Sequence, residues 1–219
     1  MACDKLRVVG NNGDAINKFK QYLHKCFHMK DLGRLKYFLG VEVAQSSKEI
    51  FLCQQKYALD IITEAGSLAA KPAATPCEEN HWLAFVVGPV ISDPSMYRRL
   101  IGRLMYLCFT RPDLTYSVHV LSQFMQNPRT EHWHAALRVV RYLKGHPGQG
   151  ILLPKENDLQ LDGWCHSDWA GCLLMRRSLT GWFIQFGTAP ISWKTQKQQM
   201  VFASSAEAEY RSMARQPGN

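Results

Sequence analysis

Residues 131–171 read EHWHAALRVVRYLKGHPGQGILLPKENDLQLDGWCHSDWAG, and the expected secondary structure changes within this stretch. The residues expected on the buried face of a helix ending at Lys144 are Trp133, Leu137, Val140 and Leu143. The run 145–148 contains two glycines and a proline, which end the helix. Leu159 and Leu161 then alternate with polar residues, as in a β-strand. This change predicts an α+β fold with a domain boundary between residues 148 and 149.

Upstream of this stretch the sequence predicts a mostly helical first domain, residues 1–148, with one β-hairpin. Helices are expected over residues 12–29, 56–65, 94–109, 111–127 and 131–144, where apolar side chains recur at helical spacing. Two β-rich runs, 35–44 and 50–53, flank a polar turn and predict the hairpin. Residues 67–93 are interrupted by proline and glycine, which predicts an irregular linker across the surface.

Downstream, residues 149–219 predict a second, strand-rich domain. Further strands are expected over residues 180–186, 190–193 and 199–203, and a helix over residues 206–214. The second domain is therefore expected to consist of a sheet followed by one helix.

The chain is basic, with 26 Lys and Arg against 18 Asp and Glu and a formal net charge of +8. This excess favours a polyanionic partner, nucleic acid first and an anionic membrane surface second, although an ordinary solvated surface would show the same excess. The side chains that we expect to contact nucleic acid are Arg138, Arg141, Lys144, Arg177, Lys194 and Lys197.

Composition also indicates where the protein is expected to act. The longest apolar run, residues 83–91, is far shorter than the roughly 20 residues that span a bilayer, and no charged-then-apolar leader opens the chain. The seven cysteines form no C-x-x-C pair, which favours free thiols in a reducing compartment over disulfides or structural zinc. We expect an intracellular protein, cytoplasmic or nuclear, that is not bound to a membrane.

Carboxylates in the second domain offer a candidate metal site. Asp168 is expected at a strand end, and Glu207 and Glu209 at the start of the last helix. Carboxylates on neighbouring elements can hold Mg²⁺, with nearby cations holding phosphate. The alternative is structural, because glutamates are favoured at a helix N-terminus by the helix dipole.

Ordered blocks of sequence give this pattern a context, because together they cover nearly the whole chain. The blocks are Met29–Gly33, Lys36–Val43, Gln55–Ala58, Lys71-Pro72, Thr75-Pro76, Tyr97–Gly102, Thr110–Asp113, Arg141–Gly145, Ser167–Gly171, Arg177–Gly181 and Ser204–Tyr210. In this order they resemble the copia-type retrotransposon Pol polyprotein. The resemblance implies the C-terminal part of a reverse transcriptase, with its palm end and its thumb or connection helices. It also implies that the start of a ribonuclease H-like mixed sheet follows.

For the polymerase, the resemblance implies a Y-x-D-D turn just before a Val-Val-Gly run, which is residues 8–10 here. The corresponding stretch is Ala2-Cys3-Asp4-Lys5. Only Asp4 matches a catalytic aspartate, and Lys5 places a cation where a metal ligand is required. Polymerase activity is therefore not expected.

For the nuclease, the resemblance implies four carboxylates that hold two Mg²⁺ ions. Glu209 matches the helix glutamate, whereas the expected strand aspartate is His166, and the two later aspartates are not in the sequence. Asp168 lies two residues farther along, roughly 6–7 Å away on a regular strand. Asp168 and Glu209 thus form an incomplete site, and we expect no productive Mg²⁺ binding.

The expected function is that of an inactive remnant of an RNA-directed DNA polymerase and ribonuclease H that binds an RNA/DNA hybrid or a single strand weakly. Two alternatives remain open. In the first, a fuller copy of the polyprotein completes the nuclease site in trans. In the second, the chain is a host-recruited protein-interaction module that uses the unpaired edge of its incomplete sheet.

Overall fold

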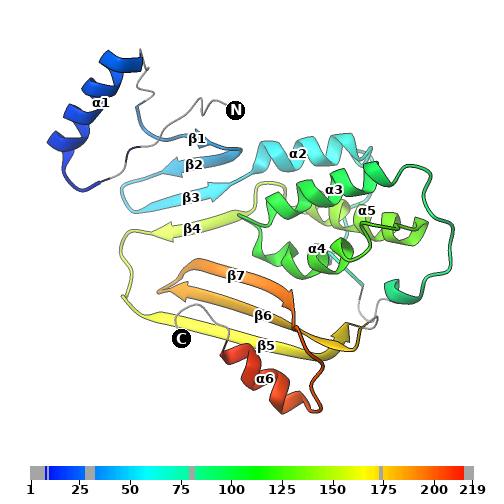
Figure 1. The fold of residues 1–219 in the computed structure, drawn as a ribbon. Coiled ribbons are helices and arrows are strands. Elements are labelled where there is room, and N and C mark those ends of the chain that lie inside the picture. Colours follow the sequence, from blue (N-terminus) through cyan, green and yellow to red (C-terminus); the bar gives the residue numbers. More distant parts are fainter. Residues whose placement is uncertain (1–7, 9, 28–32, 79–81, 173–174, 215–219) are drawn as a thin grey trace. The chain divides into compact units, whose positions relative to one another are not determined.

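A computed structural model describes residues 8, 10–27, 33–78, 82–172 and 175–214. The chain divides into two compact units, Met1–Lys36 and Tyr37–Asn219 (Figure 1). The boundary predicted between residues 148 and 149 falls inside the second unit and stays a prediction.

The described part of the first unit contains one helix, α1 (Gly13–Phe27). The side chain of Asn12 accepts a hydrogen bond from the Ala15 N–H at 3.0 Å, which satisfies one of the free donors at the helix start. The helix predicted over residues 12–29 is confirmed, and its apolar side chains, such as Phe19 and Phe27, are exposed within this unit.

The second unit begins with a four-stranded antiparallel sheet in the order β1-β2-β3-β4. Its strands are β1 (Tyr37–Phe38), β2 (Val41–Gln45), β3 (Glu49–Cys53) and β4 (Gly150–Pro154). The predicted hairpin is confirmed by the pairing of β2 with β3. The sequence did not single out β4, which returns from far along the chain to pair with β3.

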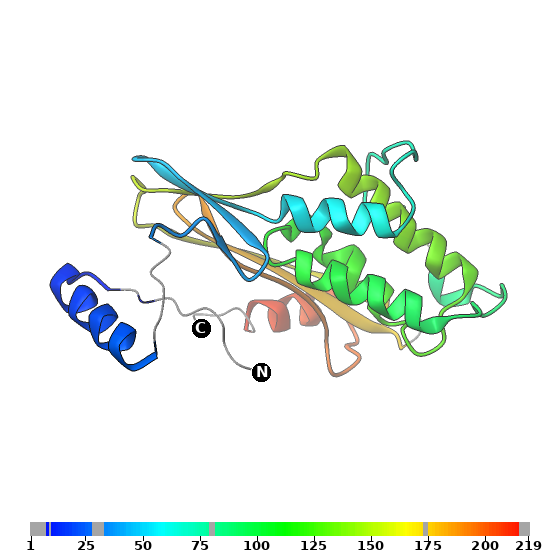
Figure 2. The same cartoon turned by 90° about the horizontal axis from the view of Figure 1, so that it is seen from above.

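A helical layer continues from this sheet and contains the main core. Its elements are α2 (Gln55–Glu64), η1 (Leu83–Phe85), α3 (Pro94–Leu107), η2 (Pro112–Leu114), α4 (Thr115–Ser122) and α5 (Thr130–Gly145). Figure 2 shows α2, α3 and α5 side by side. Aliphatic side chains from α2 to α5 form one buried cluster that includes Ile61, Ile101, Leu104 and Val140.

The core face of α5 differs in part from the prediction. Val140 and Leu143 are buried as expected, but Trp133 and Leu137 are only half-buried. Ala136 and Val139 are buried in addition. The expected linker is confirmed as a run without α-helix between α2 and α3 in the described residues, broken by η1.

A second, three-stranded sheet follows in the antiparallel order β5-β6-β7. It consists of β5 (Leu161–Cys172), β6 (Arg177–Phe186) and β7 (Ala189–Lys197), and the chain then enters α6 (Ser205–Met213). The strand predicted over residues 199–203 is wrong. The neighbouring side chains of Met200 and Val201 are both exposed, so the run lacks strand alternation and connects β7 to α6.

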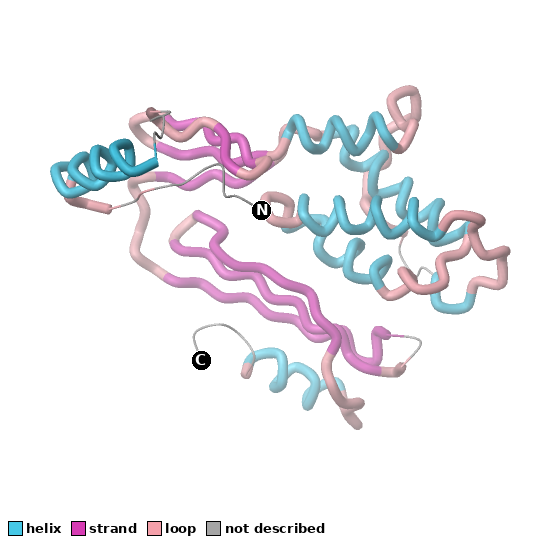
Figure 3. Tube along the Cα trace, turned by 45° about the horizontal axis from the view of Figure 1, so that its top comes forward, coloured by secondary structure: helices cyan, strands magenta, loops and turns pink. Residues whose placement is uncertain are grey.

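The second sheet packs between two layers. Figures 1 and 3 show α6 on one side of it and the helical layer on the other. On the helical side the indole N–H of Trp193 donates to the Cys108 carbonyl at 2.8 Å. The α+β class is thus confirmed. The sheet expected in the second domain was mixed, whereas the described strands pair antiparallel throughout. None of the described helices is long and apolar enough to cross a membrane.

Candidate functional site

The candidate site lies where β5 meets α6. The imidazole Nδ1 of His166 on β5 is 3.1 Å from the carboxylate Oε1 of Glu209 on α6. The His166 side chain is 78% exposed and the Glu209 side chain 33%, so the pair is open to solvent on one side. The structure therefore brings together the strand position and the helix glutamate that the sequence singled out.

The Glu209 carboxylate is held from two sides. The backbone N–H of Ser167 donates to its Oε1 at 3.1 Å, and the Ser212 hydroxyl lies 3.4 Å from its Oε2. Glu207 has a different role, because its Oε2 accepts from the Ala203 N–H at the start of α6. Only Glu209 of the two candidate glutamates thus faces β5.

A buried glutamine, Gln198, fixes this junction. Its side-chain nitrogen lies 3.2 Å from the Ser167 hydroxyl, 2.8 Å from the Thr180 hydroxyl and 3.0 Å from the Ala208 carbonyl. It therefore links β5, β6 and α6. Sequence analysis missed Gln198, because it stands among other polar residues and nothing in the local pattern marks it as buried.

Asp168 lies two residues beyond His166 on β5. Burial raises the pKa of the Tyr116 phenol on α4, and the negative charge of Asp168 raises that pKa further. Among the described residues no hydrogen bond or ion pair joins Asp168 to Glu209. Ala170 adopts a φ of 55°, and the pairing of β5 with β6 is irregular between Asp168 and Cys172, so the strand is not regular here.

Gly171 lies within this irregular stretch. A Cβ atom on Gly171 would lie 2.1 Å from the Asp168 carboxylate, which can turn away, and 3.1 Å from the Asp168 carbonyl oxygen, which is a tight contact with the backbone. A larger residue at this position would therefore require the Asp168 side chain to move.

The donor atoms at this site do not suit Mg²⁺. Within the described ranges no group of three or more His, Cys, Asp or Glu side chains is placed to hold a metal ion. Mg²⁺ prefers hard oxygen ligands, whereas the pair offers one imidazole nitrogen and one carboxylate.

Two of the three predicted cations of α5 contact the linker. The Arg138 guanidinium donates to Glu78 at 2.9 Å and to the Thr75 hydroxyl at 3.1 Å. The Lys144 ammonium donates to the carbonyls of Leu68 and Ala70, the latter at 2.7 Å. Arg141 lines a cavity beside Arg138. Two of these cations thus hold the linker on α5, and their contact with nucleic acid stays a prediction.

The other predicted cations lie on the second sheet. Lys194 and Lys197 are three residues apart on β7, so they project from opposite faces. The Lys194 ammonium is 5.5 Å from the centre of the Trp182 ring. Arg177 begins β6. The remaining candidate, Asp4, lies outside the described residues.

Comparisons with known proteins place this chain in a family. A family model described as reverse transcriptase (RNA-dependent DNA polymerase) matches residues 1–79. An uncharacterized mitochondrial protein of Arabidopsis thaliana is 38% identical over 96% of this chain and 88% of its own length. The chain is a reverse transcriptase-type Pol segment, and it belongs to the copia-type retrotransposon Pol family.

Its relatives include much longer proteins. The Pol polyproteins of the Arabidopsis thaliana transposons RE2 and RE1 are 41% and 40% identical over 96% of this chain. The chain spans 14% of the length of each of these polyproteins. No solved structure matches the chain.

Proposed function

We propose that the chain joins the C-terminal part of a copia-type reverse transcriptase to the beginning of a ribonuclease H-like domain, that it is catalytically inactive, and that it binds nucleic acid weakly. Three antiparallel strands followed by a helix support the nuclease-like assignment, because this order brings Glu209 to the strand position that the resemblance implies. The RE1 and RE2 relatives are both named as Pol polyproteins, which supports the proposal that the chain is part of a Pol polyprotein.

One observation carries the proposed inactivity: the side chain 3.1 Å from Glu209 is the imidazole of His166 and not a carboxylate. Two-metal hydrolysis requires carboxylate oxygens that hold the ions on either side of a phosphate. No hydrogen bond or ion pair joins Asp168 to Glu209 among the described residues, so we infer that Asp168 does not replace the missing ligand.

The proposed nucleic-acid binding rests on the charge of +8 and on the cations of the second sheet. Arg177, Lys194 and Lys197 are the best candidates, because Arg138 and Lys144 already bind the linker. Lys194 and Lys197 project from opposite faces of β7, so few phosphates can be contacted at one time. We therefore propose weak binding that depends strongly on salt.

The nuclease assignment is tested by incubating a labelled RNA/DNA hybrid with the chain and Mg²⁺ or Mn²⁺, beside a Glu209→Gln variant. We expect no cleavage of the hybrid that depends on Glu209. Cleavage by the chain that is lost in the variant would contradict the proposed inactivity.

Binding is tested with the same hybrid over a salt series. Each phosphate contact adds a slope of about −0.9 to log K against log salt for B-form duplex and about −0.7 for single strands. We expect a slope of about −1 to −3 that becomes shallower by about one in Lys194→Gln. A matched Lys48→Gln change, in the turn between β2 and β3 of the first sheet, should leave the slope unchanged. Absence of salt-dependent binding would refute this part.

A further inference from the structure

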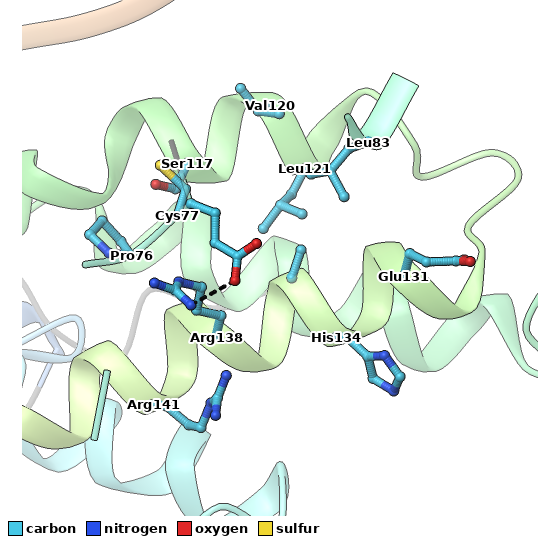
Figure 4. Close-up of a pocket in the computed structure, with 12 residues that line it drawn as sticks. Pro76, Cys77, Leu83, Ser117, Val120, Leu121, Glu131, His134, Arg138 and Arg141 are labelled. Carbon is cyan, nitrogen blue, oxygen red and sulfur yellow. Dashed lines mark hydrogen bonds and ion pairs between the residues drawn. The ribbon is translucent and has the colours of Figure 1, made fainter. Parts of the chain in front are cut away.

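A cavity of about 270 Å³ lies between the linker, α4 and α5, away from the Glu209 site (Figure 4). Much of its wall is apolar and is contributed by Pro76, Leu83, Val120, Leu121 and Ala135. An apolar wall with a few polar groups is the usual character of a small-molecule site. Nothing in the function proposed above uses this cavity.

Hydrogen-bond donors without partners line the same cavity. Ser117 is only 3% exposed, and its hydroxyl has no hydrogen-bond partner among the described residues. The Nε of Arg138 is likewise buried and unpaired, although the other nitrogens of this guanidinium bind Glu78 and Thr75. The carboxylate Oε2 of Glu131, on the same lining, is a buried acceptor that also has no partner among the described residues. Because buried polar groups are nearly always paired, the two unpaired donors at Ser117 and Arg138 indicate a missing acceptor beside them.

Arg141 adds a charged donor. It lies one helical turn after Arg138 on α5, and within the described part of the chain its guanidinium forms no hydrogen bond or ion pair. Figure 4 shows Arg138 and Arg141 near one end of the cavity and Glu131 toward the other. Glu131 precedes Arg138 by seven residues, which is about 10 Å along a helix axis. Glu78 also lines the cavity and pairs with Arg138 at 2.9 Å, so Arg141 is the lining guanidinium that has no carboxylate partner among the described residues.

We propose that this cavity binds a small organic anion, namely a carboxylate with a compact apolar body. Its carboxylate would accept from Arg141, from the Nε of Arg138 and from the Ser117 hydroxyl. Its apolar body would pack against Leu83, Val120 and Leu121. The volume is slightly below the roughly 300–1,000 Å³ of sites for drug-sized ligands, which suits a body of about one ring.

The probe is benzoate, followed by two-dimensional amide NMR of the ¹⁵N-labelled full chain, with neutral benzamide as the isostere. We expect saturable shifts at the amides of Leu121 and Ala135 with a dissociation constant that is roughly millimolar. Benzamide should bind at least about tenfold more weakly, because it has one neutral carbonyl oxygen in place of a charged carboxylate that can pair with Arg141 through two oxygens. Equal binding of the two probes, or no saturable shift with benzoate, would overturn the proposal.

Variants separate binding from folding. Arg141→Gln should weaken benzoate binding about tenfold, whereas Arg99→Gln on the exposed side of α3 should not change it. Ser117→Ala should weaken binding severalfold without lowering the thermal midpoint, since the lost hydroxyl has no partner among the described residues. Benzoate binding that is unchanged in both Arg141→Gln and Ser117→Ala would overturn the assigned site.

Discussion

The most informative substitution in the fold is Arg111→Met, in the Thr-Arg-Pro-Asp block. Arg111 is 1% exposed, and its guanidinium binds the Asp113 carboxylate through two nitrogens, at 2.9 and 2.7 Å. A third nitrogen donates to the His146 carbonyl at 3.0 Å. One buried side chain thus joins the turn between α3 and α4 to the end of α5.

The expected loss follows from these contacts. Removing one partner of a buried ion pair costs about 3–5 kcal/mol, because the other charge stays behind without compensation. Asp113 is 23% exposed and regains some hydration, so we expect about 3 kcal/mol for Arg111→Met. For a domain of this size each kcal/mol lowers the melting temperature by about 2–4 °C, which gives about 6–12 °C.

The assay is urea unfolding followed by circular dichroism, in a double-mutant cycle with Asp113→Leu. The double variant should lose less stability than the two single variants together, by about 1 kcal/mol or more, because neither charge is then left alone. A loss below about 1 kcal/mol for Arg111→Met, with additive single changes, would refute the structural role of this pair.

Three further changes test other parts of the account. Burial lowers the pKa of His132, so the unfolded chain binds a proton near pH 6.5 more readily than the folded chain. Stability in urea melts should therefore hold above about pH 6.5 and fall below it, and an equally steep fall in His132→Gln would contradict this assignment. Gln198→Leu should cost about 1–3 kcal/mol in urea unfolding, because the Ser167 and Thr180 hydroxyls lose their shared partner, and an unchanged midpoint would count against that network. Gly66→Ala should cost about 1 kcal/mol in thermal unfolding because φ is +65°, whereas Gly102→Ala inside α3 should be neutral or stabilising; the same sign for both would be inconsistent with the backbone argument.

Local patterns in the sequence were sufficient for most helices and for the hairpin. Apolar spacing predicted α3 and α5 to within two residues at each end, and the helix expected over residues 56–65 stops just before Gly66, which adopts a positive φ. These features depend on neighbours within a few residues, so the sequence pattern contains them.

Long-range pairing was beyond the same reasoning. β4 pairs with a strand about one hundred residues earlier, and an Ile-Leu-Leu run carries no information about its partner. The contacts that Arg138 and Lys144 form with the linker were not predicted either, because helical spacing shows which face these residues occupy but not what covers that face. Gln198 was missed because burial of a polar side chain depends on three elements meeting around it.

The candidate site was predictable as far as the resemblance reached. Matching blocks singled out His166 and Glu209, and the structure places their side chains 3.1 Å apart. Asp168 was expected roughly 6–7 Å from the strand position that His166 occupies, for a regular strand. The irregular pairing after Asp168 and the positive φ of Ala170 are tertiary features that the spacing could not predict.

The most direct test of the account is a Mn²⁺ titration of the ¹⁵N-labelled chain, in which the paramagnetic ion broadens amide signals near its binding site. The account predicts no selective broadening at Ser167 and Glu209 in the native chain, because an imidazole stands where a carboxylate ligand is required. Broadening should appear at these two amides in His166→Asp. Selective broadening in the native chain at the same Mn²⁺ concentrations as in the variant would contradict the claim that His166 disables this site.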